Sequence, residues 1–85
     1  MLMQEVTIRK KEVTSRDTAT LVQCAMKFES EIFFEQPSKR INGKSLMGVI
    51  SLGLKDGAKM VITAKGADEA DAIRELTALI NHDFN

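Results

Sequence analysis

Residues 31–42 read Glu-Ile-Phe-Phe-Glu-Gln-Pro-Ser-Lys-Arg-Ile-Asn and predict a β-hairpin. Residues 31–36 form the first expected strand, and residues 39–42 form a short second one. Between them, Pro37-Ser38 makes a turn, because proline presets the backbone dihedral at its position in the turn. Since the strands of a hairpin run antiparallel, the sheet around them is expected to be antiparallel.

Two further strands are expected on either side of this hairpin. Polar and apolar residues alternate over residues 3–9 and again over residues 59–65, as in a strand with one buried face. Gly66 ends the second of these strands.

Three helices complete the pattern. Ser15 is the expected N-cap of the first, whose apolar positions recur at helical spacing from Thr18 to Phe28. The second covers residues 45–54, and the third follows Asp68, another expected N-cap. The order βαββαβα buries its apolar faces best as an α+β domain, with one antiparallel sheet and all three helices on a single face.

Size and composition restrict the class of protein. Eighty-five residues fit one domain, residues 1–85, and the hydrophobic content of 44% is enough for a packed core. The chain has no apolar run near the roughly 18 residues of a membrane span, and its alternating N-terminus predicts no signal peptide. With a single cysteine, it is expected to be a cytoplasmic protein. One cysteine, one histidine and no phosphate-binding glycine loop predict no disulfide, metal site or nucleotide cofactor. Cys24 is expected to be a small buried hydrophobe.

Charge is balanced in number but not in position. Residues 1–67 hold 11 basic and 7 acidic residues, whereas residues 68–85 hold 1 basic and 5 acidic residues. A basic patch is therefore expected outside the last helix, drawn from Arg9, Lys10, Lys11, Arg16, Lys39, Arg40 and Lys44. Such a patch suits phosphate groups or acidic protein surfaces, and it is too weak to indicate nucleic-acid binding.

Residues 42–53 read Asn-Gly-Lys-Ser-Leu-Met-Gly-Val-Ile-Ser-Leu-Gly and place Ser45 at a helix start. The simplest interpretation is an N-cap, worth about 1 kcal/mol. The alternative is a phosphorylation site. A phosphate there would be favoured by the helix dipole and by the free amides of residues 47 and 48, and it would add about two negative charges beside Lys44.

The short helix after Ser45 is apolar on more than one side. Val49 and Leu52 share one face, and a helix lying on one sheet can bury only one stripe. The other apolar residues are therefore expected to be exposed as a docking patch: Leu46, Met47 and Ile50. Gly48 lies between them and leaves room for another chain to approach. The alternative, burial of every apolar residue of this helix, is difficult in 85 residues.

The element order and the serine segment resemble HPr, the small phosphocarrier protein of the bacterial sugar phosphotransferase system. The resemblance extends to residues 21–23 (Leu-Val-Gln), to Asp56-Gly57 and to Gly66. It implies an open-faced βαββαβα sandwich. The family's catalytic motif, Gly-aliphatic-His-Ala-Arg-Pro-Ala, corresponds here to residues 12–18, Glu-Val-Thr-Ser-Arg-Asp-Thr.

That correspondence puts Thr14 at the position of the family's phosphate-accepting histidine and Asp17 at that of the proline. The only histidine, His82, is expected to be a surface residue near the end of the last helix. Asp17 would stabilise the helix start and oppose an anionic phosphoryl group at Thr14. No catalytic residue is therefore expected.

The chain is most similar in kind to the histidine-lacking, catabolite-repression branch of the family. This resemblance implies phosphorylation of Ser45 by HPr kinase/phosphorylase and binding to a LacI-type catabolite control protein as a corepressor, without enzyme activity. The partner contact would fall on Arg16, Lys44, Leu46, Met47 and Ile50. A monomer or weak homodimer is expected. A diverged phosphocarrier and an inert paralogue that binds phosphotransferase-system proteins remain the alternatives.

Overall fold

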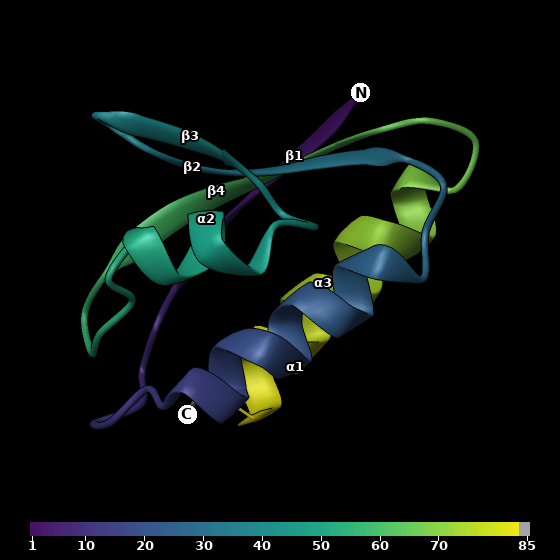
Figure 1. Ribbon diagram of the computed structural model, residues 1–85. Helices are drawn as coiled ribbons and strands as arrows, with labels where there is room; N and C mark the ends of the chain where they lie inside the picture. Colours follow the sequence, from purple (N-terminus) through teal and green to yellow (C-terminus); the bar gives the residue numbers. More distant parts are fainter. Residues whose placement is uncertain (84–85) are drawn as a thin grey trace.

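The computed structural model describes residues 1–83 and contains the predicted order of seven elements (Figure 1). The elements are β1 (Leu2–Thr7), α1 (Ser15–Met26), β2 (Glu31–Gln36), β3 (Lys39–Asn42), α2 (Leu46–Ser51), β4 (Lys59–Lys65) and α3 (Glu69–Asp83). The expected hairpin is confirmed, since β2 and β3 pair antiparallel with Gln36 opposite Lys39.

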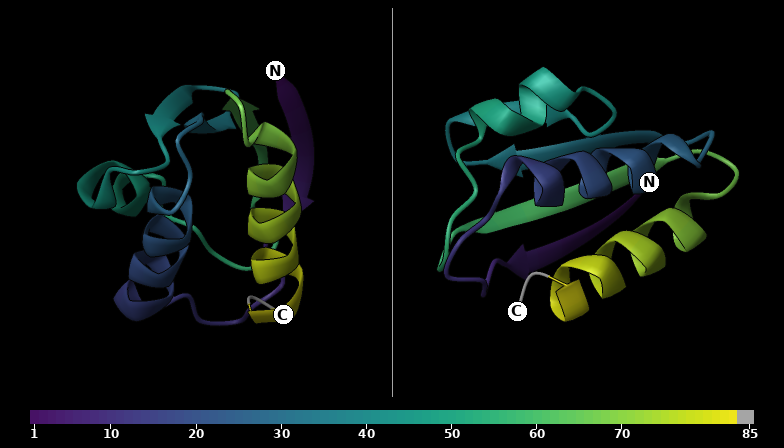
Figure 2. Two further views of the ribbon diagram at one scale, coloured as in Figure 1. Left: turned by 90° about the vertical axis from the view of Figure 1, so that its right-hand side faces the viewer. Right: turned by 60° about the horizontal axis from the view of Figure 1, so that its bottom comes forward.

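The four strands form one antiparallel sheet in the order β1-β4-β2-β3. Central β4 pairs with β1 on one side and with β2 on the other, so that Val61 lies between Glu5 and Glu35. The three helices lie on one side of this sheet, leaving its other face open (Figure 2). α3 packs on β1 and β4, α2 packs on β3, and α1 packs against both other helices.

The core lies between the sheet and the helices. The alternation predicted for β4 is confirmed, since Met60, Ile62 and Ala64 are all buried. The helical spacing expected in α1 is confirmed by buried Leu21 and Ala25, and α3 also buries an apolar stripe that includes Leu76. Within residues 1–83, no helix has the length and apolar character required to cross a membrane.

The connection from α1 to β2 is tied to the start of α3 by Asp68. Its carboxylate accepts the backbone N–H groups of Glu29 at 2.9 Å and Ser30 at 3.0 Å, and it also accepts the Ser30 hydroxyl. The Ser30 hydroxyl and the Glu29 amide hold the pKa of Asp68 below its usual value. Asp68 holds the predicted N-cap position, since its carbonyl accepts the Ala72 N–H at 3.0 Å, but its carboxylate binds the α1–β2 loop.

Candidate functional site

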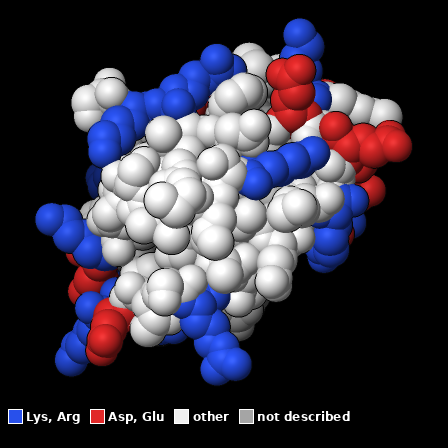
Figure 3. Space-filling view, in the orientation of Figure 1, with Lys and Arg blue, Asp and Glu red and all other residues white. Residues whose placement is uncertain are grey.

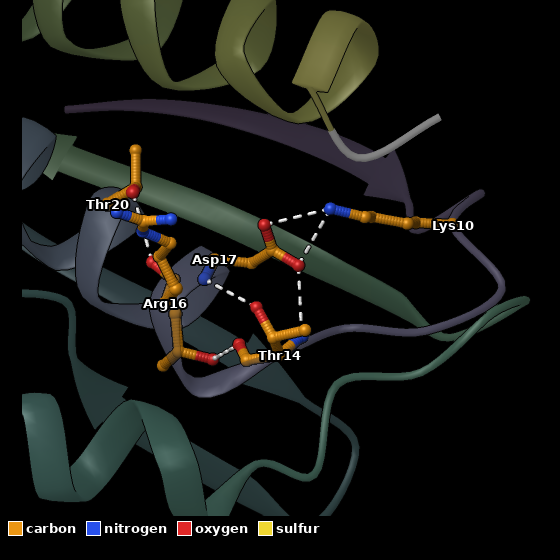
Figure 4. Close-up of polar contacts among 6 residues, drawn as sticks. Lys10, Thr14, Arg16, Asp17 and Thr20 are labelled. Carbon is orange, nitrogen blue, oxygen red and sulfur yellow. Dashed lines mark hydrogen bonds and ion pairs between the residues drawn. The ribbon is translucent and has the colours of Figure 1, made fainter.

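The start of α1 carries a capping box built by Thr14 and Asp17 (Figure 4). The Thr14 hydroxyl accepts the Asp17 N–H at 3.1 Å, and the Asp17 carboxylate accepts the Thr14 N–H at 2.9 Å. The predicted N-cap, Ser15, is instead the first residue of the helix. Thr14 is the cap because the carboxylate three residues after it completes the reciprocal bonds.

Lys10, in the β1–α1 loop, binds the carboxylate of this capping box. Its ammonium group lies 2.8 Å from both carboxylate oxygens of Asp17, as Figure 4 shows. The bond to Lys10 first, and then the Thr14 amide, lower the pKa of Asp17. The N-terminus of α1 is thus already occupied by a carboxylate that the protein itself supplies.

The predicted basic residues are spread over several places. Arg9, Lys10 and Lys11 line a hollow beside Thr14, and Arg16 is exposed on the first turn of α1. Two others lie on β3. The Lys39 ammonium donates to the Ser51 carbonyl at 2.8 Å, at the end of α2, and the Arg40 guanidinium lies 3.9 Å from the centre of the Phe33 ring.

Ser45 is exposed and caps α2, as the simpler interpretation of the sequence predicts. Its hydroxyl accepts the Gly48 N–H at 3.2 Å, and its carbonyl accepts the Val49 N–H at 2.9 Å. One of the two amides expected to be free, that of Gly48, is therefore already bonded to the Ser45 hydroxyl.

The two-sided character of α2 is confirmed. Val49 is 1% exposed and Leu52 is 7% exposed, so the inward stripe is buried. The outward residues, which we call the α2 patch, are Leu46 at 42%, Met47 at 77% and Ile50 at 46% exposed. Figure 3 shows a broad uncharged area on the face that carries α1 and α2, with Lys and Arg along its margins.

Gly48 has a different role from the one predicted. A Cβ atom at this position would lie 2.6 Å from Cγ2 of Ile41, so the missing side chain lets α2 approach β3. The expectation that Gly48 leaves room for another chain is wrong, because that space is filled by this chain's own strand.

The Lys44 ammonium is bonded to a backbone carbonyl of another segment. The half-buried side chain donates through Nζ to the Phe28 carbonyl at 2.5 Å, just beyond the end of α1. Local sequence carries no signal for this contact, since Phe28 is 16 residues away and is brought near by the packing of α1 against α2.

The single cysteine and histidine lie outside this arrangement. Cys24 packs at the edge of the core and is only half-buried, and this burial raises its thiol pKa. His82 lies exposed in the last turn of α3, as predicted. Among residues 1–82, whose side chains the structure describes, no group of three or more could hold a metal ion.

Comparison with known proteins gives the class: a family whose members are small phosphocarrier or regulatory proteins rather than enzymes. The family model described as "PTS HPr component phosphorylation site" matches residues 3–82. The chain therefore belongs to the HPr family, and the fold and the resemblance of the serine segment are in agreement with this assignment.

Individual relatives agree over the whole chain. The HPr-like protein Crh of Bacillus subtilis is 36% identical over 84 residues, which covers 98% of this chain and 99% of the relative. The crystal structure of HPr-C-His from Thermoanaerobacter tengcongensis has a TM-score of 0.93 and 39% identity, covering 99% of this chain and 96% of that one.

A crystal structure of Bacillus subtilis Crh, described as a dimer with a swapping domain, has a TM-score of 0.76 and 35% identity. It covers 100% of this chain and 99% of that one. The family assignment thus rests on both sequence and fold.

Proposed function

We propose that this protein is a regulator of carbon catabolite repression that no longer carries phosphate to sugars. In this proposal HPr kinase/phosphorylase phosphorylates Ser45, and the phosphorylated form binds a LacI-type catabolite control protein in the cytoplasm. The observation that carries the proposal is the exposure of Ser45 directly beside the α2 patch, whose three apolar side chains do not contribute to the core.

The start of α1 supports the loss of the carrier function. A phosphocarrier of this family needs an imidazole at the position that Thr14 occupies, and the threonine hydroxyl here accepts a capping bond from Asp17. The Asp17 carboxylate and the Lys10 ammonium fill the helix terminus where a phosphoryl group would otherwise be stabilised. The one histidine is on α3 and not in the loop before α1.

Phosphorylation at Ser45 would place charge next to an apolar surface without requiring a new fold. The phosphate would add about two negative charges at the start of α2, where the helix dipole favours an anion. A partner could recognise the phosphate with arginine or lysine and cover the α2 patch with an apolar pocket. Arg16 is exposed and could meet a carboxylate of the same partner.

Incubation with HPr kinase/phosphorylase and ATP, followed by mass spectrometry of the peptides, tests the modification. We expect one phosphate on the peptide containing Ser45. The variant Ser45→Ala should remain unmodified, whereas Ser51→Ala, which removes an exposed hydroxyl from the same helix, should be phosphorylated normally. An unmodified wild-type protein would reject the proposed regulation.

Binding by the α2 patch is tested with a matched pair of charge substitutions. Met47→Asp should weaken binding of the phosphorylated protein to the control protein at least tenfold, because it places a charge in the apolar contact. Met3→Asp is the control: Met3 is 60% exposed but lies on β1, at the opposite edge of the sheet from β3 and α2. Equal affinities for both variants would reject the patch as the contact surface.

A further inference from the structure

The loop from Phe28 to Ser30 is held by two opposite charges from two different elements. On one side, the Lys44 ammonium donates to the Phe28 carbonyl at 2.5 Å. On the other side, the Asp68 carboxylate accepts the amides of Glu29 and Ser30. Lys44 is the residue before Ser45. The loop from Phe28 to Ser30 is therefore in direct contact with the residue next to the proposed modification site.

The backbone that presents Lys44 is fixed. Asn42 accepts the Lys44 N–H with its side-chain oxygen at 2.9 Å and the Ser45 N–H with its carbonyl at 3.0 Å. Gly43 donates its N–H to the Ile32 carbonyl at 2.7 Å, and a Cβ atom on Gly43 would lie 2.8 Å from Cγ2 of Ile32. Because the turn is held in this way, the long Lys44 side chain can reorient when the charge at Ser45 changes, while the backbone stays in place.

We propose that Lys44 couples the charge on Ser45 to the α1–β2 loop. In the unmodified protein the ammonium holds the Phe28 carbonyl. When Ser45 carries a phosphate, the ammonium turns to that dianion, and the loop from Phe28 to Ser30 becomes looser. The inference deepens the proposed function, since it concerns the response to charge at the same serine.

The preference follows from the strengths of the two acceptors. A hydrogen bond from an ammonium to an anionic oxygen is roughly twice as strong as one between neutral groups, so a phosphate dianion competes well with a neutral carbonyl. Glu29 and Glu31 line the same hollow as Lys44. Transfer of the ammonium would leave the Phe28 carbonyl to water and bring a cationic contact to the phosphate.

The test uses phosphoserine incorporated at position 45 during synthesis of the full chain, so it does not depend on any kinase. Four proteins are compared by NMR: unmodified and phosphorylated chains, each with Lys44 or with Lys44→Met. The readouts are the carbonyl ¹³C shift of Phe28 and the hydrogen-exchange rates of the Glu29 and Ser30 amides. The amides of β4 serve as internal references for global stability.

We expect phosphoserine at position 45 to shift the Phe28 carbonyl resonance and to raise exchange at Glu29 and Ser30 about three- to tenfold. Lys44→Met alone should produce the same changes, and phosphorylation of that variant should add none. A matched control, Lys39→Met, removes a lysine that bonds the end of α2 and should leave the loop unchanged.

Two results would overturn the inference: no change at Phe28, Glu29 and Ser30 on phosphorylation, or an equal change with methionine at position 44. Failure of the kinase experiment would leave this test intact, because the phosphate is supplied chemically. A negative result in this NMR experiment would leave the proposal that the control protein binds the α2 patch unchanged.

Discussion

Val49 and Met47 lie two positions apart on α2, and we expect the first to contribute to stability and the second to binding. Val49→Ala removes two buried carbon atoms at a site that is 1% exposed. At about 0.8 kcal/mol for each group, the lost transfer energy is about 1.6 kcal/mol, and the cavity left behind adds about 1 kcal/mol. The higher helix propensity of alanine returns about 0.5 kcal/mol, so the expected net loss of unfolding free energy is about 2 kcal/mol.

Met47→Ala should change binding and leave the stability nearly unchanged. Because Met47 is 77% exposed, its truncation removes little buried area, and we expect a stability change within about 0.5 kcal/mol. The same change should weaken binding of the phosphorylated protein to the control protein, since Met47 is the most exposed member of the α2 patch.

Urea denaturation followed by circular dichroism measures the stabilities, and isothermal titration calorimetry measures the affinities. In thermal melts, a loss of about 2 kcal/mol should lower the Tm by about 8–16 °C for a domain of this size. Equal stability losses for Val49→Ala and Met47→Ala would show that α2 does not present one buried and one exposed face.

The pKa values of Asp17 and Asp68 are lowered on folding, so their stabilising contribution is complete well above the ordinary carboxyl pKa of 3.8 and is lost as the pH falls below it. Urea titrations from pH 7 to pH 3 should show this loss, and it should shrink in Asp68→Asn; a flat profile would contradict it. Thr14→His alone should accept little phosphate from phosphoenolpyruvate through enzyme I because the Asp17 carboxylate remains at the helix start, and adding Asp17→Pro should raise the labelled fraction; full labelling of the single variant would argue against that obstruction. Gly43→Ala should cost about 1–3 kcal/mol of unfolding free energy in urea titrations, since its Cβ would lie 2.8 Å from Ile32, and an unchanged midpoint would show that the turn adjusts freely.

The strands of the sheet and the two faces of α2 could be predicted from the sequence, because both follow from short repeats in the pattern of apolar residues. Alternation in residues 59–65 gave β4 with its exact bounds, and the three- to four-residue spacing in α2 separated Val49 from Met47. β1 ends at Thr7, two residues earlier than predicted. Beyond it, Ile8 is still buried and bonds Ala58 and Gly57, outside the regular strand.

The start of α1 was predictable in part. Thr14 and Ser15 are both good N-cap residues, and hydroxyl chemistry alone does not separate them. The signal that does is Asp17, which lies three residues after Thr14 and so completes a capping box with it. The ion pair of Asp17 with Lys10 depends on the path of the β1–α1 loop, for which no periodic pattern exists.

Contacts between segments far apart in the chain could not be predicted from the sequence. Lys44 meets Phe28 across 16 residues, and Asp68 meets Ser30 across 38. Both depend on where the ends of α1 and α3 come to rest after the core has packed. The same limit applies to Gly48, whose flexibility suggested an open surface until packing placed Ile41 against it.

Control by Ser45 is tested most simply by the affinity of the LacI-type control protein for this chain before and after phosphorylation of Ser45, measured by isothermal titration calorimetry. We predict binding at least tenfold tighter with the phosphate in place. Equal affinity of the two forms, with phosphate on Ser45 verified by mass spectrometry, would contradict the proposal that this serine controls the protein.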